Sequence, residues 1–400
     1  MSIANDIQTL NDKMAAALNA GDADAALKLA RKAARHAEDE RLKLLLEARA
    51  AEAGDDWSGA ERAWGQLTRL PGGRLAGLRG AAAAAIERGD AGSAEARARE
   101  ALELKTGADW PFNSLFDLQV SRGEWPAALE TLGTGEKRGL ISGDSLRRRR
   151  AVVLTAHAAS MGADQRQTAQ RTLAEAIRAA PGFPPAAWHG ARHLMVDGKV
   201  KAAQGVLEIA WKSRPHPALA QLARRLDPDA SPADTVRRLS SLAAANPLHR
   251  ESRILKAEMA IDARDWIGSV KALALLVEEK PTARLCLLME RSLNGYGDKA
   301  EAERWARMAT TASREADWSD IDPRGGAFDY DAKDWARLVY AFGDVGDLIH
   351  ARHEAFGREL EAGRTIALPA PVKDAADAAP LADKVAGAIG PPLDYAPDED

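Results

Sequence analysis

Apolar residues recur at helical spacing along most of the chain, and short polar breaks beginning with Gly-Asp or a close variant separate the apolar runs. Each break is followed by an amphipathic run that carries a small residue at a fixed position. The spacings between successive small residues are 34, 34, 34, 41, 34, 32, 34 and 33. These anchor residues are Ala26, Ala60, Ala94, Ala128, Ala169, Ala203, Thr235, Ser269 and Ala302. The chain is therefore built from an internal repeat.

This period is typical of the tetratricopeptide repeat, in which each unit is a pair of antiparallel helices. Trp57, Trp125 and Trp266 lie at equivalent places and are predicted to start second helices. We expect them to act as hydrophobic staples rather than to stack on a ligand. Prolines that follow four anchors predict where second helices end: Pro181, Pro215, Pro247 and Pro281. We expect an all-α solenoid of about nine helix pairs over residues 1–312.

The period stops at Ser313, and the rest of the chain divides into two parts. Residues 313–369 are predicted to be a capping segment, whose short helices at Trp335–Phe342 and Leu348–Leu360 close the open end of the array. Residues 370–400 carry seven acidic and two basic side chains together with five prolines. This composition predicts a disordered acidic tail.

The amino-acid composition supports packed helices and reduces the range of possible functions. The 400 residues include 85 alanines and 20 aromatic residues, which favours helices over a β-sandwich or barrel. A formal net charge of −4 gives no drive toward nucleic acid, so we expect no nucleic-acid partner. No apolar stretch is long enough to cross a bilayer, and the residues from Met1 to Asp6 lack the features of a signal peptide. The sequence as written predicts a cytoplasmic protein.

Several short sequence segments, which occur in the same order as in that family, resemble the HemY family, the tetratricopeptide proteins of proteobacteria that are associated with haem biosynthesis. They are the segments Leu44–Ala51, Leu78–Gly80, Phe116–Gln119, Arg148–Ala156, Trp211–Ala220, Asn246–Pro247, Glu251–Arg253 and Pro281–Cys286. The resemblance implies a scaffold at the cytoplasmic face of the inner membrane, with haem-biosynthesis enzymes as partners.

Two departures from that family limit what the resemblance implies. Its members usually begin with two membrane-spanning helices, which are absent here, so we expect this chain to correspond to the soluble part. Some relatives carry a cysteine-rich, zinc-ribbon-like segment near the C-terminus. The matching stretch, Asp317–Asp329, contains no cysteine, and zinc binding is not carried over.

The sequence shows no candidate catalytic constellation, and we expect a protein that is not an enzyme. The single cysteine, Cys286, lies in an apolar helical context that predicts a buried, inert thiol. The four arginines from Arg147 to Arg150 are interpreted as a solvated helix face with local acidic partners; an anionic lipid or nucleic acid is the alternative. Two histidine pairs have ligand-like spacing, with a solvated helix face as the simpler interpretation: His189 with His193, and His350 with His353.

The first helix of each pair should line a concave binding surface. Two positions of this helix, one helical turn apart and at a fixed offset before each anchor, are predicted to face inward. The first position holds Arg79, Asn113, Trp188, Ile254 and Leu287, and the second holds Arg49, Ala83, Asp117, Arg192, Glu258 and Arg291. The recurring arginines suit carboxylates, either of a peptide or of porphyrin propionates. The alternative is that they pair with acidic neighbours on adjacent helices.

Two functional hypotheses follow from the repeat and the resemblance. The first is a non-catalytic scaffold that docks partner proteins of haem and porphyrin biosynthesis. The second is a tetrapyrrole-binding carrier that uses the basic groove or a histidine pair; otherwise we expect no cofactor and no metal. The acidic tail, residues 370–400, is predicted to dock weakly on the groove arginines and to lower partner affinity, more at low salt than at high.

Overall fold

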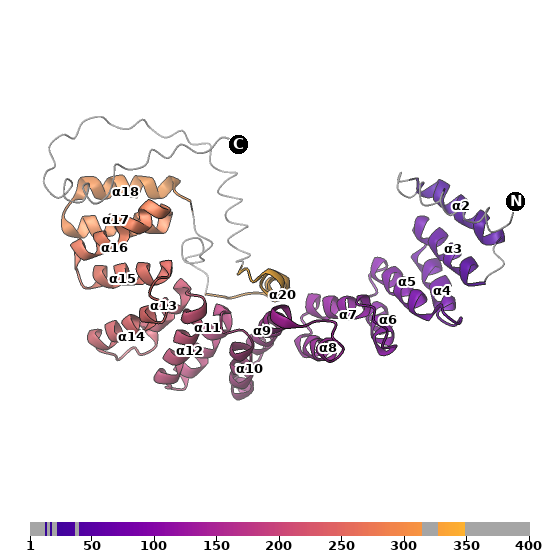
Figure 1. The fold of residues 1–400 in the computed structure, drawn as a ribbon, viewed down its shortest axis with the longest axis horizontal. Helices are drawn as coiled ribbons and strands as arrows, with labels where there is room; N and C mark the ends of the chain where they lie inside the picture. Colours follow the sequence, from indigo (N-terminus) through magenta and orange to yellow (C-terminus); the bar gives the residue numbers. More distant parts are fainter. Residues whose placement is uncertain (1–12, 14–16, 18–21, 37–39, 314–326, 349–400) are drawn as a thin grey trace, which may run out of the picture. The chain divides into compact units, whose positions relative to one another are not determined.

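The computed structural model describes residues 13, 17, 22–36, 40–313 and 327–348, and these form helices and connecting turns (Figure 1). The chain divides into two compact units, Met1–Ser142 and Gly143–Asp400. The boundary falls at the glycine-rich connection between the anchors Ala128 and Ala169, where the spacing between anchors is longest. Each unit is described separately below.

In the first unit, successive helices pack against each other in chain order. After the second helix of the first pair, α2 (Ala23–His36), three complete pairs follow. They are α3 (Glu40–Ala53) with α4 (Trp57–Leu67), α5 (Arg74–Glu87) with α6 (Ala91–Glu103), and α7 (Trp110–Ser121) with α8 (Trp125–Lys137).

In the second unit, the described residues form five further pairs. They are α9 (Gly143–Ala159) with α10 (Arg166–Ala179), α11 (Pro184–Val196) with α12 (Val200–Ser213), α13 (Pro217–Arg225) with α14 (Pro232–Ala244), α15 (Arg250–Asp262) with α16 (Trp266–Glu279), and α17 (Ala283–Tyr296) with α18 (Lys299–Thr311). A 3₁₀ turn, η1 (Ala163–Gln165), precedes α10. The described residues contain no strand, apart from an isolated bridge between Thr282 and Ser313. The predicted all-α, tetratricopeptide-type solenoid is confirmed.

Seven of the anchor residues are buried where the two helices of a pair approach each other, whereas Thr235 is half-buried. Ala60, Ala94, Ala128 and Ala203 are fully buried, and Ala169, Ser269 and Ala302 are at most 3% exposed. Only small side chains fit at such close approaches, which is why the repeat is visible in the sequence. Three second helices begin at the predicted tryptophans, and second helices also end shortly before the predicted prolines.

Several of the turns before second helices follow the Gly-Asp pattern. Gly89 adopts φ 74°, a left-handed conformation that favours glycine, and Asp90 then caps α6 by accepting a hydrogen bond from the Ser93 amide. In the turn of the second pair, the pattern is shifted by one residue. There Asp55 is left-handed, with φ 55°, and Asp56 caps α4.

The chain returns to the start of the second unit after the repeats. Residues 327–348, here called the returning segment, contain α20 (Ala332–Tyr340) and the π-helical turn η2 (Ala341–Val345). Both elements pack against α9. The expectation that Trp335–Phe342 closes the open end of the array after α18 is therefore wrong, because its apolar side chains are buried against the first pair of this unit instead. The predicted helix at Leu348–Leu360, beyond its first residue, and the tail at 370–400 lie outside the described residues.

Candidate functional site

The first helices of the second unit lie side by side. α9 contacts α11, α11 contacts α13, and α15 contacts α17, while hydrogen bonds from α13 reach α15. We call this surface the first-helix face. One part of it, on α9, α11 and the start of α13, is covered by the returning segment, and the part on α13, α15 and α17 contains an open cavity.

Aromatic side chains attach the returning segment to the covered part. Phe328 is 1% exposed, and its ring centroid lies 6.0 Å from that of Trp188 on α11 and 5.0 Å from that of His216 before α13. Further along, the centroid of the Phe342 ring lies 4.5 Å from that of Phe183. Such ring pairs add to the free energy gained from burial. The segment is therefore held through a small number of deeply buried rings.

Two arginines of α9 bind the end of the returning segment. Arg149 donates two hydrogen bonds to the Asp344 carboxylate, at 2.9 and 3.0 Å. Arg148 donates to the carbonyl oxygens of Gly343 and Asp344, at 3.0 and 2.7 Å. A bidentate contact between a guanidinium group and a carboxylate is both strong and geometrically selective.

The interpretation of the arginine run as a face with local acidic partners is correct for Arg147, which pairs with Asp144 one helical turn away. It is wrong for Arg148 and Arg149, which bind the returning segment far along the chain. These two side chains therefore connect the first helix of the second unit with the returning segment.

His189 lies beneath the returning segment. The residue is half-buried, but its Nε2 is buried, and Nε2 has no hydrogen-bond partner among the described residues. Its ring centroid is 6.2 Å from that of Trp335. Burial lowers the pKa of His189 from 6.5 to about 4, although a hydrogen bond with the Phe328 backbone opposes the shift. The imidazole is therefore neutral at pH 7.

Among the described residues, no other histidine belongs to a group that could hold a metal ion. Burial also lowers the pKa of His193, whose Nδ1 is buried without a partner in the described part of the chain. The described residues include no cluster of three His, Cys, Asp or Glu side chains that could hold a metal ion. His350 and His353 lie outside the described residues.

The open part of the face contains a cavity of about 420 Å³. Its lining consists of Pro217, Gln221 and Arg224 from α13, Glu258 and Asp262 from α15, and Arg284, Leu288 and Arg291 from α17. Three guanidinium groups and two carboxylates thus surround one hollow, and the lining carries a single positive charge in excess.

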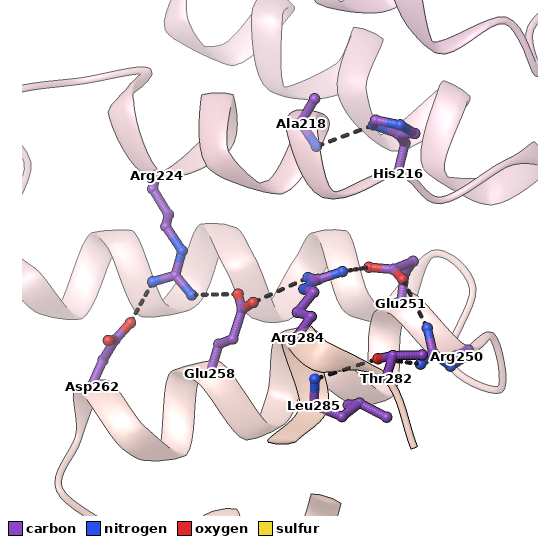
Figure 2. Close-up of polar contacts among 10 residues, drawn as sticks. All are labelled: His216, Ala218, Arg224, Arg250, Glu251, Glu258, Asp262, Thr282, Arg284 and Leu285. Atoms are coloured by element: carbon purple, nitrogen blue, oxygen red, sulfur yellow. Dashed lines mark hydrogen bonds and ion pairs between the residues drawn. The ribbon is translucent and has the colours of Figure 1, made fainter. Parts of the chain in front are cut away.

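The charged residues of the cavity belong to a row of alternating sign that we call the arginine–carboxylate ladder. In order, it consists of Arg291, Asp262, Arg224, Glu258, Arg284, Glu251 and Arg250. Figure 2 shows Arg224 of α13 reaching across to Asp262 and Glu258 of α15, and Arg284 lying between Glu258 and Glu251.

The centre of the ladder is tightly held. Arg284 donates to Glu251 at 2.8 Å and to Glu258 at 3.1 Å, and its side chain is only 11% exposed. At the outer end, Arg291 lies 3.9 Å from Asp262 and its side chain is 64% exposed. The inner groups therefore fix the spacing of three first helices, and the outer arginine faces solvent.

The residues predicted to line one groove are divided between the two units. Trp188 and Arg192 lie together on α11, where the Arg192 guanidinium stacks on the indole ring at 4.6 Å, and Arg291 lines the cavity. In the first unit, Arg49 pairs with Glu52 at 2.8 Å and lies over the ring of Trp64. Arg79, Asn113 and Asp117 are exposed on α5 and α7. Pairing with an acidic neighbour on an adjacent first helix thus describes Arg291, whereas Arg49 pairs within its own helix.

Two central members of the ladder, Arg224 and Arg284, were not predicted. A signal for Arg224 was present, because it stands at the same offset before the anchor Thr235 as Glu258 does before the anchor Ser269. Arg284 lies at the start of α17, outside the two positions used for the prediction.

No family model matches the chain. Over 207 residues it is 27% identical to the probable magnetosome protein Mms48 of Magnetospirillum gryphiswaldense, a match that covers 51% of this chain and 46% of the relative. The chain thus spans about half the length of this curated relative. The resemblance to the HemY family stays a prediction.

Among solved structures, the TPR2AB-domain:pHSP90 complex of yeast Sti1 is 13% identical, with a TM-score of 0.26, covering 76% of this chain and 98% of that chain. The Cut9 and Hcn1 hetero-tetramer of the APC/C is also 13% identical, with a TM-score of 0.27, and the match covers 81% of this chain and 74% of that chain. The fold is established by the helix pairs described above. None of the described helices combines the length and the apolar character needed to span a bilayer.

Proposed function

We propose that this protein is a non-catalytic scaffold that docks partner proteins on the first-helix face of its second unit. One observation carries the proposal: part of this face already holds a polypeptide segment, through buried rings and an arginine–carboxylate contact. The adjacent part is hollow, charged and lined by three first helices. A surface of this kind suits a partner chain better than a small substrate.

The partners we propose are enzymes of haem and porphyrin biosynthesis. Support for this choice comes from the sequence phrases that resemble the HemY family. The charged cavity is compatible with any partner that presents both carboxylates and cations.

A substitution at the cavity tests the docking surface. Arg291→Glu reverses a charge on a side chain that is 64% exposed, and Arg237→Glu does the same on α14, where the side chain is 78% exposed. With tagged full-length protein in a proteobacterial lysate, we expect Arg291→Glu to lose the captured haem-pathway enzymes and Arg237→Glu to retain them. Equal capture by both variants would place docking elsewhere. Reproducible partners without any haem-pathway enzyme would overturn only the choice of partners.

A tetrapyrrole carrier is the second candidate, favoured by the unpartnered, buried Nε2 of His189. In this structure, His189 has no room to bind the iron of a haem, because Trp335 and Phe328 of the returning segment pack around it. Titration of haem into the purified protein distinguishes the candidates. We expect no Soret shift, and a saturable shift that His189→Ala abolishes would favour the carrier.

A further inference from the structure

The returning segment shows which side chains the covered part of the first-helix face selects. Phe342 is 3% exposed, packs on Phe183, and lies under the Arg214 guanidinium at 5.6 Å from its ring centroid. Two residues later, Asp344 takes both hydrogen bonds from Arg149. An aromatic ring and a carboxylate two positions apart therefore occupy adjacent subsites.

The charge of these subsites favours an acidic ligand. Arg148, Arg149 and Arg214 all lie around the turn that ends at Asp344. Burial and the positive charge of Arg148 lower the pKa of Arg214, whereas the negative charge of Asp347 raises it. Three guanidinium groups gathered at the end of one short segment attract carboxylates from a distance and select against basic segments.

The returning segment belongs to no helix pair of the array. The repeats of a solenoid contact mainly their neighbours, and α9 packs directly on α10 and α11 directly on α12. Its own polar contact is partly open to water, since the Asp344 side chain is 41% exposed. The segment is therefore placed as a ligand of the repeats rather than as one of them.

We propose that the returning segment is a built-in competitor of the partner on α9, α11 and α13. The partner is a protein segment of the same chemistry, with an aromatic residue two positions before an aspartate or glutamate. This inference rests on the proposed function and names the chemistry that the docking face recognises. A tethered competitor acts at an effective concentration of about a millimolar, so a partner must bind the vacated face well below that level to displace it.

The test uses full-length protein and a fluorescent synthetic peptide with the sequence of residues 327–348. In the loosened variant Phe342→Ala/Asp344→Asn, the face is intact and its competitor is weakened. We expect the peptide to bind this variant roughly ten- to a hundred-fold more tightly than wild type, as expected when tethered competition is relieved. A peptide in which Asp344 is replaced by Lys should lose that affinity.

Controls separate competition from loss of fold. Adding Arg149→Glu to the loosened variant should abolish peptide binding, and adding Arg237→Glu should leave it unchanged. Hydrogen exchange should show opening of the returning segment with α9 and α11 still protected.

Three outcomes would overturn the proposal. The first is equal peptide affinity for wild type and the loosened variant. The second is joint opening of α9 and α11 with the segment, which would make the segment part of the core. The third is dimerisation of wild type through exchanged segments in analytical ultracentrifugation, which would make a second copy the occupant. No cellular partner enters this assay, so failure to capture haem-pathway enzymes leaves its result unaffected.

Discussion

Replacing Arg284 by Met should destabilise the second unit by about 3 kcal/mol, because it removes the central cation of the ladder and leaves the buried carboxylate of Glu251 behind. The side chains of Arg284 and Glu251 are each 11% exposed, and Arg284 makes hydrogen bonds of 2.8 Å to Glu251 and 3.1 Å to Glu258. Removing one partner of a buried ion pair costs about 3–5 kcal/mol, because an uncompensated charge stays behind. Arg250 and Arg224 still contact the two carboxylates, at 3.7 and 3.2 Å, which places the expected loss at the low end.

Hydrogen exchange with peptide-level readout is the appropriate assay, because the array should open locally before it unfolds as a whole. Amides of α15 and α17 should exchange faster in Arg284→Met, while those of the first unit should be unchanged. Arg237→Met is the matched control: its side chain is 78% exposed and pairs with Asp234 on the same helix, so the loss should be below about 1 kcal/mol. Neutralising the carboxylate in Arg284→Met/Glu251→Gln should recover part of the lost stability. An Arg284→Met loss no larger than that of the control would refute the reasoning.

Three further predictions concern packing and protonation. Ala203→Leu inserts a large side chain at a fully buried anchor and should cost about 1–3 kcal/mol, seen by hydrogen exchange as opening of α11 and α12 first. Gly135→Ala should destabilise α8 by a similar amount, because its Cβ would lie 2.4 Å from the buried Phe112 ring; Gly133→Ala, with nothing within 4 Å, should instead stabilise it by about 0.5–1 kcal/mol in thermal melts. The pKa of His189 is lowered from 6.5 to about 4, so the unfolded state gains a proton first as pH falls. The unfolding free energy should therefore drop by about 3 kcal/mol between pH 6.5 and pH 4, and a urea titration of His189→Gln that kept the full drop would contradict this.

The repeat was predictable because its constraints act at fixed, local positions. Ala94 and Ala203 are fully buried where two helices meet, and no larger side chain fits without displacement. Gly89 is left-handed at a turn between helices, and Trp125 begins the helix that follows such a turn. Cys286 is fully buried, as predicted, and burial raises the pKa of its thiol to about 11. Each of these features depends on residues within one or two repeats.

The site was less predictable because its contacts join residues that no period relates. Asp344 and Arg149 are 195 positions apart, and the amphipathic pattern around Trp335 indicates a helix without indicating the surface it covers. His189 is buried because the returning segment covers it, which the pattern of its own helix, α11, does not indicate. The ladder lies between these extremes: opposite charges on adjacent repeats were expected as an alternative, but the central cation, Arg284, lies outside the repeat positions that face the groove.

The alternation of charge along the ladder also gives the repeats a fixed order. Solenoid arrays commonly tolerate loss or duplication of a unit, because each interface resembles the next. Here Arg224, Glu258 and Arg291 occupy equivalent positions in three successive repeats, with Asp262 contacting both arginines. Excising the α15–α16 unit would bring Arg224 directly against Arg291 with no carboxylate between them. This stretch of the chain is therefore not interchangeable in evolution or engineering, and a shortened array would need a compensating change of sign at one of the two arginines.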